Sequence, residues 1–161
     1  MGEIVTSLGQ MEINADTKSV IPAGLLTDPS LCYATGIIDP LRPRFFLPGN
    51  VTGGNQLRGC RWADGRNMYA GFQTIFPPNG VNCNTQSPAG DAAAGIGSAA
   101  SRHQGGCHVL MGDGAVKFIT DSIEAGNRSA APAQGGAASV YGLWGSLGTR
   151  GAKENVDLNQ I

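Results

Sequence analysis

Residues 101–119 constrain the fold more than any other part of this sequence, because apolar residues alternate with other residues on both sides of an Asp-Gly pair. Such alternation around Asp-Gly is a strong β-hairpin signal. Gly114 can adopt the positive φ that a tight turn demands. The alternating apolar residues are Val109, Met111, Val116 and Phe118. We therefore predict an antiparallel hairpin that turns at Asp113 and Gly114 and directs these four side chains into the core.

The hairpin is one of a series of motifs. Nine residues separate His103 from Asp113, and three further blocks, 61–65, 72–79 and 147–151, occur before and after it. In this order the blocks resemble the prepilin-type H-X9-DG domain family (DUF1559), pseudopilin-like surface proteins of planctomycete-type bacteria. The residues that carry the resemblance are His103, Asp113, Gly114, Arg61, Trp62, Asp64, Gly65, Pro77, Pro78 and Asn79. No catalytic residues come with this family, so the resemblance gives these positions structural roles.

The resemblance implies a single pilin-like globular domain over residues 1–161, mainly β or α+β at most, with an antiparallel sheet, short helical turns and long loops. The composition agrees, since 25 glycines and 9 prolines favour short strands joined by turns. The usual N-terminal pilin helix is lacking, because the sequence opens without a basic flank and has no apolar run of about 18 residues. We expect the chain to be the C-terminal part of a longer precursor, with 130–139 as a low-complexity linker to a C-terminal segment.

Local patterns predict the remaining elements. A helical turn is expected to begin at Pro29, with Asp28 or Ser30 as its cap. The other predictions are two strands at 59–62 and 68–76 around Asp64 and Gly65, a surface loop at 90–100, and a last strand or docking segment at 140–147.

The charge of the chain excludes one class of partner. Charged residues make up 14% of the sequence and the net charge is −1. A nucleic-acid-binding protein needs a basic patch to neutralise phosphates, and an anionic membrane surface makes a similar demand. We therefore expect no nucleic-acid partner. The lack of an apolar run of about 18 residues separately predicts no membrane span in this chain.

Four cysteines, an even number, in a chain that resembles exported proteins predict two disulfides. Cys60 and Cys107 each follow a glycine and precede a motif block, so we favour Cys60–Cys107 together with Cys32–Cys83. The connectivity Cys32–Cys60 with Cys83–Cys107 is the next alternative, and a third connectivity stays open. Each bridge would stabilise the fold by about 2–4 kcal/mol.

Two histidines and two cysteines form a ligand set that would suit zinc. We nevertheless predict no metal site at His103, His108, Cys60 and Cys107, because the chain has no CxxC motif and the two histidines differ in parity along a strand. Residues of opposite parity point to opposite faces of a sheet. The preferred interpretation is a structural His103 that hydrogen-bonds backbone near the hairpin.

Two further kinds of site were weighed. A Ser101, His103 and Asp113 triad is disfavoured, since Gly-x-Ser-x-Gly is absent and a carboxylate at a turn tip bonds local amides. We therefore expect no enzyme activity and no cofactor. Calcium at Asp64 or Asp113 stays a weak alternative, because one carboxylate per loop is too few for a strong site. The remaining carboxylates considered, without ligand-like spacing, are Asp16, Asp91 and Asp121.

Two Asn-x-Ser/Thr sequons begin at Asn50 and Asn127. Neither has proline in the middle position, and both lie in turn-rich segments. A sequon arises by chance about once per hundred or two residues, so two barely exceed the chance number. In an exported protein both asparagines are nevertheless candidate glycosylation sites.

Two functions remain in contention. The first is a structural subunit of an extracellular, pilus-like helical filament at the cell surface, a homopolymer in which a terminal segment packs against a neighbouring subunit. Residues 1–20 are the favoured segment, because 2–8 resemble a strand with Ile4 and Leu8 inward and no hairpin mate. The nearly equal alternative is pairing of these residues within their own domain. The second function is a monomeric exported module that binds a polysaccharide or other ligand, although Trp62, Tyr69, Tyr141 and Trp144 are scattered in sequence.

Overall fold

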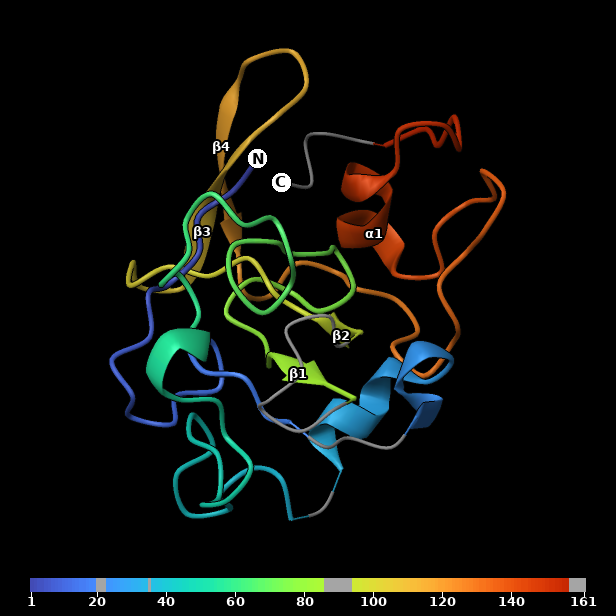
Figure 1. Cartoon of the computed structure of the whole chain (residues 1–161). Helices are drawn as coiled ribbons and strands as arrows, with labels where there is room; N and C mark the ends of the chain where they lie inside the picture. Colours follow the sequence, from blue (N-terminus) through green and yellow to red (C-terminus); the bar gives the residue numbers. More distant parts are fainter. Residues whose placement is uncertain (20–22, 35, 86–93, 157–161) are drawn as a thin grey trace.

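Two small antiparallel sheets, one short α-helix and long loops make up the computed structural model, which describes residues 1–19, 23–34, 36–85 and 94–156 (Figure 1). The strands pair as β1 with β2 and β3 with β4. The elements, with η for a 3-10 helix, are η1 (Ala23–Leu26), η2 (Pro29–Tyr33), η3 (Gly54–Gln56), β1 (Cys83–Asn84), β2 (Gly95–Ile96), β3 (Gly106–Leu110), β4 (Val116–Thr120) and α1 (Gly142–Gly148). The predicted mainly β or α+β class is confirmed, and the described residues include no long N-terminal helix.

The predicted hairpin is present as β3 and β4, but its turn is one residue longer than the Asp-Gly pair suggests. The N–H of Met111 donates to the carbonyl of Ala115 at 2.8 Å, which leaves Gly112, Asp113 and Gly114 as a three-residue loop. Gly114 has a φ of 89°, as predicted. A three-residue hairpin loop commonly places a left-handed residue at its end, and glycine accepts that conformation without strain.

The longer turn decides which side chains of the hairpin face the core. Cys107 lies opposite Ile119, and both are fully buried. Val116 and Phe118 lie on the outer face, where they are 63% and 40% exposed. A shift of one residue moves every side chain of a strand to the other face of the sheet. The prediction that Val116 and Phe118 face the core is therefore wrong, whereas Val109 is buried as predicted.

The N-terminal segment runs along the edge of β3 that β4 leaves free. Gly2 forms an antiparallel bridge with Val109, and the N–H of Glu3 donates to the carbonyl of His108 at 3.2 Å. The carbonyl of Glu3 in turn accepts from the N–H of Ala100 at 2.9 Å. The start of the chain is therefore paired within its own domain. This is the alternative that the sequence analysis gave for residues 1–20.

The same segment buries a different set of side chains from the predicted one. Val5 and Ser7 are buried, whereas Leu8 is 64% exposed and Ile4 is only half-buried. The expected inward face of Ile4 and Leu8 is therefore wrong. The hydrogen bond from the N–H of Ser7 to the carbonyl of Arg58, 3.0 Å long, fixes the segment in this orientation.

Two clusters of buried side chains form most of the core. The larger one surrounds a disulfide between Cys32 and Cys83 and joins η1 and η2 to the small β1–β2 sheet. The second packs the hairpin against α1 through Trp144, whose Nε1 donates to the carbonyl of Phe76 at 2.6 Å. Asp28 caps η2 by accepting from the N–H of Ser30, so the predicted helical turn at Pro29 is confirmed.

A buried cation connects the loops between these clusters. Arg58 is fully buried and donates to the carbonyls of Asn67, Gly71 and Ser98 at 2.5, 3.0 and 2.9 Å. Burial lowers the pKa of Arg58 to about 10. Three carbonyl dipoles, rather than a carboxylate, thus compensate part of the cost of removing this guanidinium from water.

The cysteine pairing agrees with the prediction in one half only. Cys32 and Cys83 form a disulfide with a Cα–Cα distance of 6.0 Å, as predicted. Cys60 and Cys107 are free thiols, the first exposed and the second buried, so the predicted Cys60–Cys107 bridge is wrong. Residues 59–62 form turns and bends instead of a strand, and the N-terminal segment pairs with the edge of β3 that such a strand would need.

Three other predicted elements differ from the structure. Residues 59–76 form turns and bends instead of two strands around Asp64 and Gly65. Residues 95–100 are buried and include β2, so the prediction of a surface loop is wrong for this part of 90–100. Residues 90–93 lie outside the described part of the chain. Residues 140–147 dock on the core, as one of the two predicted alternatives had it, but through the helix α1 and not as a strand. No helix within the described residues is both long and apolar enough to cross a membrane.

Candidate functional site

A carboxylate and both histidines of the chain meet at the edge of β3. Glu3 Oε1 lies 3.2 Å from His103 Nε2, and Glu3 Oε2 lies 3.4 Å from His108 Nδ1. The ligand atoms of the three side chains all lie within 4.8 Å of one another. The two imidazole rings meet edge to face, with centroids 5.0 Å apart. We call Glu3, His103 and His108 the histidine cluster.

Local backbone geometry explains why the two histidines meet. His103 precedes β3 and lies in a turn, so strand parity does not apply to it. Ser101 Oγ accepts from the N–H of His103 at 3.0 Å and donates to the carbonyl of Gly106 at 2.6 Å, which holds the turn closed. Gly105 supplies a φ of 81° within it. The parity argument used against a shared histidine site is therefore wrong, and His103 pairs with a carboxylate rather than with backbone.

The electrostatics of the cluster favour an ionised Glu3. Partial burial by itself would raise the pKa of Glu3, but the backbone N–H of His108 and the two nearby imidazoles outweigh it and lower that pKa. The N–H of His108 reaches Glu3 Oε2 at 2.8 Å. The pKa of the neighbouring Cys107 thiol is raised instead of lowered. Burial is the largest cause, and together with the charges of Glu3 and Asp121 it raises this pKa to about 12.

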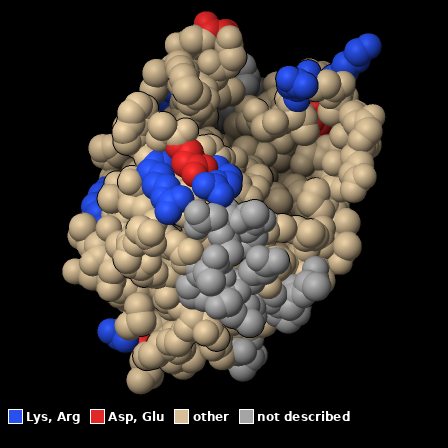
Figure 2. Space-filling view, in the orientation of Figure 1, with Lys and Arg blue, Asp and Glu red and all other residues tan. Residues whose placement is uncertain are grey.

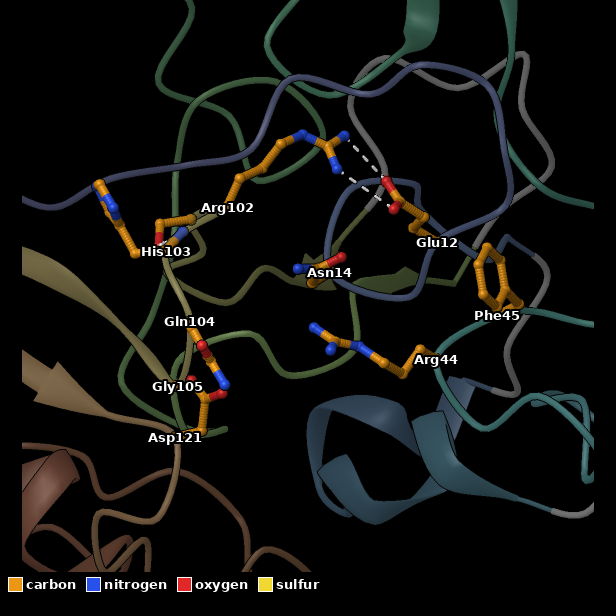
Figure 3. Close-up of a pocket in the computed structure, with 10 residues that line it drawn as sticks. Glu12, Asn14, Arg44, Phe45, Arg102, His103, Gln104, Gly105 and Asp121 are labelled. Atoms are coloured by element: carbon orange, nitrogen blue, oxygen red, sulfur yellow. Dashed lines mark hydrogen bonds and ion pairs between the residues drawn. The ribbon is translucent and has the colours of Figure 1, made fainter.

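A polar pocket of about 560 Å³ adjoins the cluster and shares His103 with it (Figure 3). Arg102 and Glu12 form a two-pronged ion pair across one side, at 3.3 and 3.0 Å. Arg44 and Gln104 extend into the space between the two sides, and Asp121 lies below them (Figure 3). The pocket therefore offers hydrogen-bonding groups of both charges.

Asn79, one of the motif residues, holds the segments around this pocket together. Its Oδ1 accepts from Asn14 Nδ2 at 3.2 Å and from the N–H of Ser101 at 3.0 Å. Its Nδ2 donates to Asp121 Oδ1 at 2.8 Å. Asn79 has a φ of 59°, a conformation that asparagine tolerates better than most residues, and it follows the buried Pro78. Asn79 thus ties the end of the 72–79 block to three other stretches of the chain.

The other motif residues lie away from the histidine cluster. Asp113 Oδ1 accepts from the N–H of Ala115 at 2.9 Å, which confirms the predicted local bond at the hairpin tip. Asp64 pairs with Arg66, and the side-chain hydrogen bond from this guanidinium lowers the pKa of Asp64 to about 2. Trp62 is 85% exposed.

The alternative sites weighed from the sequence are not assembled in the described residues. Ser101 and Asp113 use their side-chain oxygens for local backbone bonds, so the Ser101, His103 and Asp113 triad does not form. Asp16 accepts from Ser7 Oγ and from the N–H of Glu12, and burial raises its pKa. Asp91 lies outside the described residues. Asn50 and Asn127 are exposed, and their glycosylation stays a prediction.

The four scattered aromatic residues do not form a shared platform for a sugar. Trp144, Tyr69 and Tyr141 are buried, whereas Trp62 is exposed. The charged side chains on the face shown are few, and in the main group Lys or Arg lie beside Asp or Glu (Figure 2).

Comparison with known proteins identifies the family. The model of a protein family of unknown function, DUF1559, matches residues 2–126. This chain belongs to the DUF1559 family. The match covers the histidine cluster, the hairpin and the pocket, and it ends before α1. No curated protein and no solved structure matches the chain.

Proposed function

We propose that this DUF1559 protein is a structural subunit of an extracellular, pilus-like helical filament. The observation that carries the proposal is the outer edge of β4. Within the described residues β4 pairs only with β3, and no isolated bridge reaches its other side. An unpaired strand edge is a template for another chain, because its N–H and carbonyl groups remain available for a new ladder.

The side chains on this edge strengthen the argument. Val116 and Phe118 are exposed apolar residues on one face of β4. Proteins that stay monomeric usually protect an edge strand with charged residues or proline, and only Lys117 is charged between Val116 and Thr120. An incoming strand would cover Val116 and Phe118 while it pairs with the backbone.

The symmetry of a filament limits which segment can pair with β4. If two copies joined β4 to β4 in antiparallel fashion, the contact would be self-complementary and would close as a dimer. A filament needs a different segment from the neighbour. Residues 1–3 already pair with β3, and Ser7 bonds the carbonyl of Arg58, so this segment is held within its own domain. The terminal segment in this proposal is therefore residues 149–156, which follow α1 and are mostly exposed, and not residues 1–20.

Electron microscopy and size-exclusion chromatography test the proposal. Val116→Lys and Phe118→Lys place charge on the edge and should leave folded monomers, whereas the unchanged protein forms filaments. Leu41→Lys is the matched control, because Leu41 is 90% exposed on a different loop and its replacement should not affect assembly. A chain that ends at Gly148 should also fold without polymerising. Filaments of unchanged form from the Val116→Lys, Phe118→Lys double variant would refute the proposal.

A further inference from the structure

We infer that the histidine cluster is a binding site for one divalent transition-metal ion such as zinc. The inference does not depend on the filament proposal. The three side chains come from three separate stretches of chain: the N-terminal segment, the turn before β3, and β3 itself. A bound ion would therefore fasten the N-terminal segment to the hairpin.

The ligand chemistry fits such an ion. Two imidazoles and one carboxylate are a common ligand set of zinc and of other first-row metals with open coordination positions. Hard ions such as calcium prefer six or more oxygen ligands, which this cluster does not provide. His103 offers Nε2 and His108 offers Nδ1 toward the same carboxylate.

The distances fit as well. Metal–ligand bonds of about 2.1 Å in a tetrahedral site place two ligand atoms about 3.4 Å apart. The two carboxylate–imidazole separations are 3.2 and 3.4 Å. The nitrogens of the two imidazoles are at most 4.8 Å apart. Since the side chains of His103 and His108 are 55% and 43% exposed, small rotations of these rings can bring both nitrogens to a common ion.

The surroundings leave room and do not repel a cation. A cavity of about 620 Å³ opens beside Glu3 and His103, so further positions around the ion would be filled by water. The guanidinium of Arg102, the residue before His103, is directed toward Glu12 and away from the His103 ring (Figure 3). Its charge is therefore largely balanced by a carboxylate outside the cluster.

Titration of the metal-free protein with zinc alone, followed by calorimetry, tests the inference. All measurements use a protein that carries Cys60→Ser, because the exposed thiol of Cys60 could bind zinc outside the proposed site. We expect one ion per chain. His103→Gln, His108→Gln and Glu3→Gln should each weaken binding by at least about tenfold, since even the loss of a partner outside the first coordination sphere costs about 10–100-fold.

Glu12→Gln is the matched control, because Glu12 lies on the same side of the molecule and pairs with Arg102, not with the histidines. It should leave zinc affinity unchanged. Cobalt provides a second measurement, as its visible ligand-field bands report imidazole coordination and should vanish in the His103→Gln, His108→Gln double variant. Circular dichroism without metal verifies that each variant is folded. Equal zinc affinity in the double variant, an equal loss in Glu12→Gln, or no stoichiometric binding by the Cys60→Ser protein would overturn the inference.

Discussion

The hairpin register predicts that two adjacent residues of β4 differ sharply in their contribution to stability. Ile119 is fully buried opposite Cys107, in the cluster that contains Trp144. Replacing a well-packed isoleucine with alanine costs about 2–5 kcal/mol through lost transfer free energy and the cavity left behind. We expect Ile119→Ala to fall in this range.

Phe118→Ala should cost much less. Complete burial of a phenylalanine side chain is worth about 1.5–3 kcal/mol. Phe118 keeps 40% of its surface exposed and contacts His108 edge to face at 5.1 Å. We therefore expect a loss of about 1–2 kcal/mol, scaled to the buried part of the ring.

Urea unfolding, followed by tryptophan fluorescence, measures both changes in the chain that ends at Gly148, which is expected to stay monomeric. Equal m-values among the variants would show that they expose similar surface on unfolding, so that the free energies can be compared directly. Val116→Ala is the control for the outer face and should cost less than about 1 kcal/mol. If Phe118→Ala destabilised the protein as much as Ile119→Ala, the three-residue turn would be refuted and a two-residue turn at Asp-Gly would replace it.

Three further predictions follow from single features of the fold. Gly114→Val should destabilise the protein by about 1–3 kcal/mol, because Gly114 has a φ of 89°. Gly112→Ala is the control and should change the free energy of unfolding little in the same urea assay, since Gly112 has no positive φ and no close neighbour. Equal effects of the two substitutions would contradict the turn geometry. Alkylation followed by peptide mapping should find Cys60 modified rapidly in the native protein and Cys107 only after unfolding, since burial raises the pKa of Cys107 to about 12; rapid native labelling of Cys107 would contradict its burial. The pKa of Asp64 lies at about 2, below its ordinary value, so its carboxylate stabilises the native state above the unfolded pKa and loses this contribution as the pH falls through about 2. The unfolding free energies of the unchanged protein and Asp64→Asn should therefore converge toward pH 2, and a gap as wide there as at neutral pH would refute the prediction.

Turn chemistry explains how far the sequence could predict the hairpin. The alternation and the Asp-Gly pair correctly located two paired strands, because these signals depend on residues within a few positions of one another. The length of the loop could not be read from the same pattern, since Asp-Gly is compatible with loops of two and of three residues. A single residue in the loop then exchanged Phe118 for Ile119 as the core residue of β4.

The cysteine pairing shows that contacts between residues far apart in the sequence are hard to predict from local patterns. Cys32 and Cys83 meet because η2 and β1 pack in one cluster. Cys60 and Cys107 were expected to lie on adjacent strands. The structure instead places the N-terminal segment beside β3, so the neighbour of Cys107 is set by residues about 100 positions away, a relation that local spacing cannot reveal.

The histidine cluster could not be predicted for both reasons: local turn geometry and the pairing of residues far apart in the sequence. Strand parity separates His103 from His108 only if both lie in the same strand, and the turn closed by Ser101 places His103 outside it. The third member, Glu3, reaches the cluster through the pairing of residues 1–3 with β3, which no motif predicted. The positions of the two histidines were therefore available from the sequence, but their common carboxylate was not. Zinc affinity at this cluster therefore depends on the pairing of the N-terminal segment with β3. If that segment detached from β3, Glu3 would move away from the histidines. Two histidines without the carboxylate would bind zinc more weakly.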